Sequence, residues 1–320
     1  MALIGFHASH ELYSPRGLLA HVQRAEQAGF QAAMCSDHFH PWTPSQVHSG
    51  YSFAWLGAAL ATTSIPIGTI CYPAGRYNPA IIAQAAATLA QMFPSRFWLA
   101  LGTGQFLNEH ITGEAWPSKR KRQQKLLESV QLIRALWSGE TVTHHGRVNV
   151  ESAKLYSLPD RPPLLFGAAT TAQTAAWLAP WADGLLTVNS DPQTMRDIVA
   201  AFRDHGGAGK PMYLQSMIGY DVDEERAWHD ACQRWPIAAL EQDQLQNVAT
   251  PAEFARLTAH VRPSDLKGKL RVSSHLSQHL DWLRGDLELG FDAIFHYSIS
   301  GSQEQFIDAF ASSILPNLTK

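Results

Sequence analysis

The chain has 320 residues, of which 45% are hydrophobic and 17% are charged, and its formal net charge is −3 at pH 7 with histidine counted as neutral. This length and composition suit a compact enzyme built as one (β/α)8 barrel with insertions. Without an excess of positive charge, the chain lacks the electrostatic field that attracts nucleic acid or an anionic membrane. We therefore predict a small-molecule substrate, and neither a nucleic-acid nor a membrane partner.

The three cysteines, Cys35, Cys71 and Cys232, show no paired spacing, which is typical of reduced thiols in a cytosolic protein. The first residues have no basic region, and their apolar run is too short for a signal peptide. No stretch reaches the roughly 18 apolar residues that a membrane-spanning helix needs. We predict a cytoplasmic location.

Short apolar runs of strand length alternate with longer helical patterns, as in a parallel sheet with crossover helices. Eight such runs occupy residues 3–7, 32–36, 65–69, 97–101, 164–167, 184–188, 212–220 and 293–297. Eight strands favour a closed barrel over an open doubly wound sheet, which commonly has about five or six. The sequence predicts an α/β fold, a (β/α)8 (TIM) barrel with insertions, in which residues 1–320 form a single domain.

Two helix starts are readable because Ser14-Pro15 and Asn78-Pro79 each place a capping residue before a proline. The second helix, Pro79–Met92, contains no charged residue. A helix without a charged face is buried against something, whereas the outer helices of a barrel normally meet water. We predict a homodimer with Pro79–Met92 at or near the interface.

Three further segments stand out between the strands. Residues 119–137 show helical spacing and begin with the basic turn Lys119-Arg120-Lys121-Arg122. This turn is either solvated or in contact with an anionic cofactor tail or nucleic acid. We predict an inserted hairpin at residues 141–156 and a polar, helical insertion at residues 223–271.

Polar residues, ring-bearing residues and glycines gather where three of the predicted strands end. Residues 36–42 read SDHFHPW, residues 76–79 read RYNP and residues 100–109 read ALGTGQFLNE. In parallel barrels the catalytic groups lie where strands end and loops begin. The pattern predicts an active rim, and hence an enzyme.

His38 and His40 follow the second predicted strand, two residues apart, so an extended backbone would point both rings to one side. His38 is interpreted as a general acid or base, or as a cofactor contact. The alternatives are a structural histidine and a metal pair formed with His40, which would suit a barrel hydrolase. Pro41 interrupts the extension and the pair follows the second strand, so the sequence favours no metal.

Gly102 and Gly104 allow a planar or phosphorylated ligand to approach the backbone closely. Gln105 and Asn108 follow them, and their amides match the donor and acceptor edge of a heterocycle. A second glycine-containing junction, LLFGAATT at residues 164–171, ends a strand in small and hydroxyl side chains. Backbone N–H groups there are expected to hold a phosphate, and the alternative is a plain helix cap at Thr170 or Thr171.

With these junctions the chain resembles the bacterial-luciferase-like flavin oxidoreductases, and most of all the branch around the deazaflavin-dependent glucose-6-phosphate dehydrogenases. The matching segments are HASHE (7–11), SDHFHPW (36–42), RYNPAIIAQ (76–84) and LGTGQFLNE (101–109), followed by matches within 128–139 and at 290–292. The resemblance spans nearly the whole chain. It implies a barrel that holds a flavin or deazaflavin ring at its carboxyl-terminal rim.

The resemblance also implies roles for individual residues. Three are candidate catalytic residues: His38, Gln105 and Glu11. Trp42, together with Glu11, would border the substrate. The resemblance further implies a bulge in the third strand at Ile70-Cys71, often with a non-prolyl cis peptide. Cofactor contacts are expected from Asp37, Ile70, Cys71, Gly102, Thr103, Gly104, Asn108, Gly167, Ala168 and Thr170.

The chain departs from the sugar-phosphate dehydrogenases at two places. Their proton-donating glutamate is replaced by Gln105, whose amide cannot donate in that way. Their substrate-phosphate lysine falls where this chain has residues 187–192, which include Asp191, and a carboxylate there would repel phosphate. Both departures argue against glucose 6-phosphate as the substrate.

We therefore predict an FMN-dependent oxidoreductase, a luciferase-like monooxygenase or reductase, that acts on a small organic substrate. NAD(P)H is a candidate electron donor, and the flavin would perform the electron chemistry. The nearest alternative is a dehydrogenase or reductase dependent on the deazaflavin coenzyme F-420 (F420). The remaining alternatives are a metal-dependent hydrolase that uses His38 and His40, and a flavin-binding barrel without catalysis.

Overall fold

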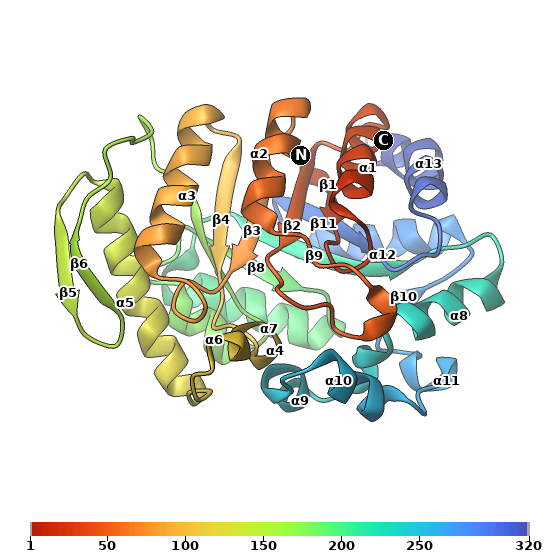
Figure 1. The fold of residues 1–320 in the computed structure, drawn as a ribbon. Coiled ribbons are helices and arrows are strands. Elements are labelled where there is room, and N and C mark those ends of the chain that lie inside the picture. Colours follow the sequence, from red (N-terminus) through yellow and green to blue (C-terminus); the bar gives the residue numbers. More distant parts are fainter. Residues whose placement is uncertain (1, 319–320) are drawn as a thin grey trace.

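The computed structural model describes residues 2–318, and a closed barrel of eight parallel strands forms its centre (Figure 1). The sheet closes because β11 pairs with β1 on one side and with β9 on the other, while β9 also pairs with β8. This confirms the predicted (β/α)8 barrel. The barrel strands are β1 (Leu3–Ala8), β2 (Ala32–Ser36), β3 (Ile67–Cys71), β4 (Phe97–Leu101), β7 (Leu165–Ala168), β8 (Gly184–Val188), β9 (Met212–Gly219) and β11 (Ala293–Ser298).

All eight predicted strands are present, and the third is the one whose bounds were most in error. The sequence placed it at residues 65–69, but β3 begins at Ile67, two residues later. Pro66 has no N–H group for the strand ladder, so regular pairing starts after it. The Pro66 carbonyl still accepts a bond from the Ala33 N–H at 2.9 Å, but the first bond that β3 donates is from the Ile67 N–H to the Arg96 carbonyl, at 2.8 Å.

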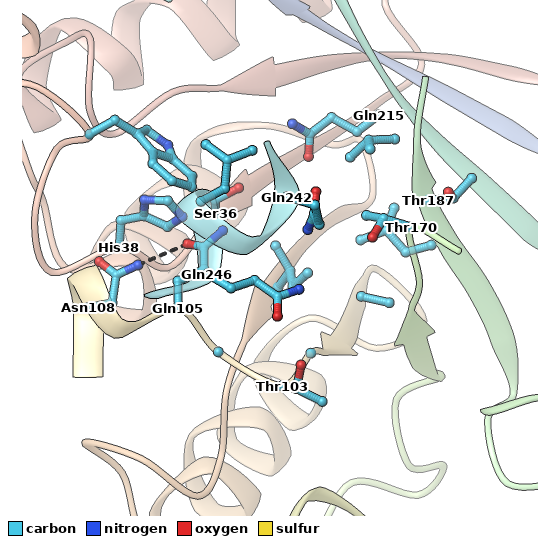
Figure 2. A pocket seen from close by; sticks show the side chains of 18 of the residues that line it. Ser36, His38, Thr103, Gln105, Asn108, Thr170, Thr187, Gln215, Gln242 and Gln246 are labelled. Carbon is cyan, nitrogen blue, oxygen red and sulfur yellow. Dashed lines mark hydrogen bonds between the residues drawn. The ribbon is translucent and has the colours of Figure 1, made fainter. Parts of the chain in front are cut away.

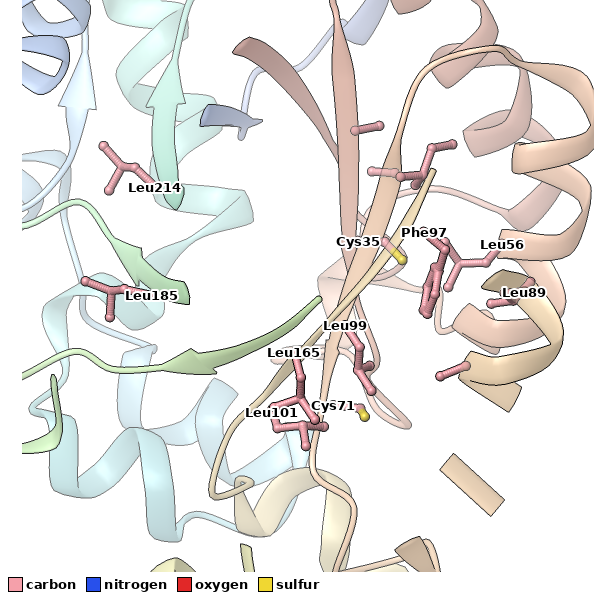
Figure 3. Packing of buried hydrophobic residues seen from close by; sticks show 14 of the residues in the cluster. Cys35, Leu56, Cys71, Leu89, Phe97, Leu99, Leu101, Leu165, Leu185 and Leu214 are labelled. Carbon is pink, nitrogen blue, oxygen red and sulfur yellow. The ribbon is translucent and has the colours of Figure 1, made fainter. Parts of the chain in front are cut away.

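The strands are continuous apolar runs because both of their faces are buried. In β4, Trp98 and Ala100 point into the barrel, where they pack with Phe166 and Phe295. The alternate residues Phe97, Leu99 and Leu101 face the outer helices, as Figure 3 shows.

One glycine makes room for the ring at the centre of the barrel. A Cβ atom on Gly68 would lie 2.0 Å from the Trp98 ring, so β3 needs a glycine at this position. The identity of this residue is therefore decided by interior packing and not by a turn.

The outer helices begin where the sequence predicted their caps. Ser14 accepts a hydrogen bond from the Gly17 N–H at 3.3 Å, and Asn78 accepts one from the Ala80 N–H at 3.0 Å. The main outer helices are α1 (Pro15–Gln27), α2 (Ser52–Thr62), α3 (Pro79–Met92), α5 (Lys119–Trp137), α6 (Ala172–Leu178), α7 (Pro192–Phe202), α12 (Leu276–Glu288) and α13 (Gln303–Ser313). No helix within residues 2–318 has the length and apolar character to cross a membrane.

The predicted insertions are both present. The hairpin consists of β5 (Val142–His145) and β6 (Asn149–Ala153), which pair antiparallel. In Figure 1 the small helices of the second insertion lie together beyond the strand ends that also carry α4 (Phe106–Glu109). This insertion contains α8 (Glu224–Arg234), α9 (Gln242–Asn247), α10 (Pro251–Thr258) and α11 (Pro263–Leu266), and the short strand β10 (Arg271–Val272) follows it.

The charge-free helix α3 packs one side against the barrel and α5. On its other side Ile81 is 52% exposed and Met92 is 57% exposed. The neighbouring helix α2 also contains no charged residue. The two helices together present a neutral outer surface.

Candidate active site

A cavity of about 420 Å³ opens at the carboxyl-terminal ends of the strands. In the view of Figure 2, His38, Gln105 and Asn108 lie on one side, Thr170 and Thr187 lie on the other, and Gln242 from the insertion lies between them. Thirteen of the fourteen residues named from the sequence line this cavity: Glu11, Asp37, His38, Trp42, Ile70, Cys71, Gly102, Thr103, Gly104, Gln105, Asn108, Ala168 and Thr170.

Gly167 is the exception, because it does not line the cavity. A Cβ atom at this position would lie 2.9 Å from Leu178 of α6. The glycine therefore allows α6 to pack closely on β7, which is a structural reason for its presence.

His38 and Glu11 form the central pair of the site. The His38 Nδ1 atom lies 3.0 Å from Glu11 Oε1, although the ring N–H and the oxygen are not aligned as in a good hydrogen bond. Burial lowers the pKa of His38 to about 4, with the nearby Arg76 charge acting in the same direction. Burial raises the pKa of Glu11. His38 is therefore neutral at pH 7, as a general base must be.

Asp37 lies at the rim within a buried ion network. Its Oδ2 atom is 2.6 Å from Arg76 Nη2, and its Oδ1 atom accepts a hydrogen bond from Ser52 Oγ at 2.7 Å. The other guanidinium nitrogen of Arg76 lies 2.6 Å from Glu109 Oε1. Arg76 thus neutralises two buried carboxylates and joins the loop after β3 to the ends of β2 and β4. The sequence placed Arg76 in a rim motif without giving it this function.

His40 does not share a site with His38. Its Nδ1 atom is 3.0 Å from the Leu107 carbonyl oxygen, and its ring stacks on His110. Among residues 2–318, no three His, Cys, Asp or Glu side chains are placed to hold a metal ion. The metal-pair interpretation is therefore not supported, because the chain turns after His38 and directs the second ring elsewhere.

Asn108 joins two of the rim segments. Its carboxamide oxygen accepts hydrogen bonds from the backbone N–H groups of Phe39 (2.9 Å) and His40 (3.2 Å). Its Nδ2 group donates to Gln105 Oε1 at 3.2 Å, the dashed contact in Figure 2. With its oxygen engaged, the Gln105 amide has its NH2 group for donation to a ligand.

The glycine loop after β4 has room for a flat ligand. Gly104 has a φ of +76°, and a Cβ atom there would lie 2.6 Å from the Tyr72 ring, so both conformation and space require glycine. At Gly102 a Cβ atom would approach only Ala168 and Ile70, at 3.8 Å. Small and aliphatic groups therefore form the floor of the cavity beside this loop.

The expected bulge at Ile70-Cys71 is wrong. Each residue of β3 pairs with one residue of β4, so no extra residue is present to form a bulge. The peptide bonds described by the structure are all trans, including the one between Ile70 and Cys71. Both residues nevertheless line the cavity.

At the opposite wall, the structure shows which of Thr170 and Thr171 caps the helix and which lines the cavity. Thr171 is the N-cap of α6 and accepts a hydrogen bond from the Thr174 N–H at 3.3 Å, whereas Thr170 lines the cavity. Asp191 caps α7, is exposed and does not line the cavity. The expectation that Asp191 would repel a bound phosphate is therefore wrong, because its carboxylate serves the helix N-terminus.

Sequence reasoning missed the wall that the insertion contributes. Trp42 is buried between His38 and two insertion residues, with its ring centroid 6.0 Å from that of Trp235 and 5.4 Å from that of Phe254. These side chains come from helices that carry no recognisable motif. The lining residues not named from the sequence include Thr187, Asn189, Gln215, Met217, Trp235, Ile237, Gln242, Leu245, Gln246, Lys269 and Tyr297.

Comparisons with known proteins agree with this geometry. A family model described as luciferase-like monooxygenase matches residues 1–311. An F420-dependent glucose-6-phosphate dehydrogenase of Nakamurella multipartita is 35% identical, over 98% of this chain and 96% of that protein. The enzyme of the same name from Beutenbergia cavernae is 32% identical, over 99% and 98%.

Among solved structures, an F420-dependent secondary alcohol dehydrogenase in complex with an F420–acetone adduct superposes with a TM-score of 0.90. It is 30% identical, and the match covers 98% of both chains. The F420-dependent tetrahydromethanopterin reductase of Methanopyrus kandleri has a TM-score of 0.78 at 18% identity, which shows a shared fold.

Proposed function

Since the chain belongs to the luciferase-like monooxygenase family, we propose that it is an F420-dependent dehydrogenase that interconverts a small alcohol and its carbonyl compound. The observation that carries this proposal is the His38–Glu11 pair, which faces a cavity bounded by a glycine loop and by side chains of the insertion. The similar proteins named above are F420-dependent enzymes, which favours F420 as the cofactor. The sequence alone predicts FMN first and F420 as the nearest alternative.

The residues of the cavity fit a planar anionic cofactor. Gly102 and Gly104 leave space for a ring beside Ile70 and Ala168. Lys119, from the basic turn, lines the same cavity. This placement supports the interpretation of the basic turn as a contact for an anionic cofactor tail.

Each polar residue of the site has a distinct role in this proposal. When bound, the deazaflavin supplies the hydride acceptor. His38 takes the hydroxyl proton of the alcohol on its Nε2 atom, and Glu11 stabilises the imidazolium that results. Gln105 and Asn108 orient the cofactor through their amides, and Trp42 excludes water from the reacting carbon.

The cavity wall supports an uncharged substrate. No arginine lines the described part of the cavity. Three carboxylates line it, of which Asp37 and Glu109 are paired with Arg76 and Glu11 is not. Of the two lining lysines, Lys269 donates its Nζ hydrogen bond to the Ala239 carbonyl at 3.1 Å. A phosphate dianion would meet too little positive charge here, so we propose secondary alcohols rather than sugar phosphates.

The function is tested by titrating the purified protein with F420 and, separately, with FMN, while tryptophan fluorescence is followed. We expect micromolar binding of F420 and at least about tenfold weaker binding of FMN, followed by reduction of F420 with 2-propanol but not with glucose 6-phosphate. Trp42 makes the fluorescence responsive because it lines the cavity. Tighter binding of FMN would restore the flavin prediction, and turnover of glucose 6-phosphate would refute the uncharged substrate.

We further propose that α2 and α3 form the interface of a homodimer. Their charge-free outer surfaces support this. Replacing Ile81 with lysine should place two charges in the interface and shift the protein from dimer to monomer in analytical ultracentrifugation. Val222→Lys, a matched change at a 65% exposed position after β9, should leave the dimer intact. A wild-type protein that sediments as a monomer would contradict the proposal.

A further inference from the structure

A row of hydrogen-bonded side chains lies behind His38. The Tyr297 hydroxyl is 2.7 Å from Ser9 Oγ, and Ser9 Oγ donates to Glu11 Oε2 at 2.9 Å. The other oxygen of Glu11 faces His38 Nδ1 at 3.0 Å. Ser9, Glu11 and Tyr297 are each no more than 3% exposed. The row connects β11 with the loops after β1 and β2, and Ser9 does not itself line the cavity.

The direction of the hydrogen bonds follows from the number of protons. Ser9 has a single hydroxyl proton, which is donated to Glu11. The Tyr297 phenol must therefore donate to Ser9. Burial raises the pKa of Tyr297 well above its usual value, so the phenol keeps the proton that it donates. Its ring is held between His7 and Trp235, with centroid distances of 4.4 and 5.0 Å.

We propose that Ser9 and Tyr297 are positioning residues that hold Glu11 as a carboxylate, so that His38 carries its proton on Nδ1 and presents an unprotonated Nε2 to the cavity. A test of this proton arrangement by enzyme turnover rests on the proposed function. The arrangement of the protons does not, because it is a property of the protein alone.

The protonation of Glu11 decides which form of His38 meets the substrate. An ionised Glu11, whose Oε1 lies 3.0 Å from Nδ1, favours a proton on that nitrogen through its negative charge and leaves the Nε2 lone pair as a base. A protonated Glu11 would instead donate to Nδ1, and Nε2 would then carry the proton and be unable to accept another. Burial raises the pKa of Glu11, whereas a backbone hydrogen bond at Glu11, the His10 ring and the hydrogen bond from Ser9 lower it. Of these, the Ser9 hydrogen bond is the one made by a side-chain hydroxyl of the row, so a single substitution can remove it.

The surrounding charges act on both members of the pair. His10 faces Glu11, while His7 and His10 face His38 from the strand β1 side. Arg76 lowers the pKa of His38 and Asp37 opposes that effect. None of these groups donates to Glu11 Oε2 within the described part of the chain, so the Ser9 hydroxyl is its specific partner.

The first test is the pH dependence of kcat/KM for alcohol oxidation by the F420-loaded enzyme. Ser9→Ala should shift the acidic limb of the pH profile, where kcat/KM falls as pH decreases, to higher pH by about one unit. The reason is that a hydrogen bond to a charged group shifts a pKa by roughly one to two units. Tyr297→Phe should cause a smaller shift in the same direction. The double variant should not exceed Ser9→Ala, because Tyr297 acts through Ser9.

A merely structural role would give a different result. In that case kcat/KM at high pH would fall, but the acidic limb of the profile would stay at the same pH. That result would overturn the inference. Ser129→Ala and Tyr213→Phe are the matched controls, because both hydroxyls lie away from the row and from the cavity. Neither control should move the limb.

The second test reads the proton directly in full-length protein labelled with [15N]histidine. The His38 signals are assigned by their loss in His38→Gln. In the wild type at pH 7 we expect a protonated Nδ1 and an unprotonated Nε2, and in Ser9→Ala a shift toward the opposite tautomer. An unchanged tautomer in Ser9→Ala refutes this inference even if turnover is observed. A tautomer shift without any F420 turnover refutes the proposed function alone.

Discussion

Replacing His38 with glutamine is expected to lower kcat/KM for alcohol oxidation about 10²- to 10⁴-fold, the usual contribution of a general base. Glutamine preserves a polar group of similar size, but its amide does not accept a proton at neutral pH. Binding of F420 should be nearly unchanged, because the loss falls on proton transfer. Steady-state kinetics with 2-propanol and the fluorescence titration measure the two effects separately.

The matched control is His40→Gln, two residues along the chain. The His40 ring contacts the Leu107 carbonyl and His110, and it does not line the cavity. Its replacement should change kcat/KM by less than about threefold. Equal losses in both variants would contradict the assignment of the base, and would instead fit a site that needs both imidazoles.

Replacing Arg76 with methionine is expected to destabilise the protein by about 3–5 kcal/mol, because two buried carboxylates lose their common partner. The side chains of Arg76, Asp37 and Glu109 are 6%, 1% and 4% exposed, so solvent compensates little. Urea unfolding measures the loss at pH 7. The measurement is repeated at pH 5.

The variant should lose less stability at the lower pH. Burial raises the pKa of Glu109, and Arg76 opposes that rise in the wild type. Without Arg76 the folded pKa lies further above the unfolded value, and a folded state that binds the proton more tightly gains stability relative to the unfolded state as pH falls. The deficit of Arg76→Met should therefore shrink between pH 7 and pH 5.

Two further variants separate the loss of charge pairing from the loss of packing. Adding Asp37→Asn and Glu109→Gln to Arg76→Met removes the buried charges and should recover most of the stability. Arg24→Met removes an arginine that pairs with Asp308 at 2.6 Å on the surface, and it should have a much smaller effect. If both arginine variants lose the same stability, burial of the Arg76 network is not the cause.

Much of the barrel could be predicted because the strands and their helices are encoded locally. An apolar run such as residues 97–101 is buried on both faces, which is the pattern of a parallel strand covered by helices. Caps such as Ser14 and Asn78 act within a few residues of themselves. The start of β3 was predicted two residues too early, because Pro66 has no N–H group to donate to the strand ladder. This error also has a local cause.

The site could be located from the sequence because catalytic groups in parallel barrels lie where strands end and loops begin. Carboxyl ends of parallel strands meet at one rim, so Asp37, His38, Gly102 and Gln105 could be brought together without coordinates. The rule failed where a side chain serves the nearest helix. Asp191 caps α7, and Gly167 makes room for α6, although both lie near strand ends.

The sequence by itself thus determined the barrel, the rim and thirteen of the residues around the cavity, because those depend on periodicity and on local chemistry. Only the tertiary structure decided which rim residues pair with each other. Ser9 meets Tyr297 across 288 positions, and Trp42 meets the insertion, through contacts between segments far apart in the chain. Such contacts leave no periodic pattern, since each depends on how two separately encoded elements are placed by the closed sheet.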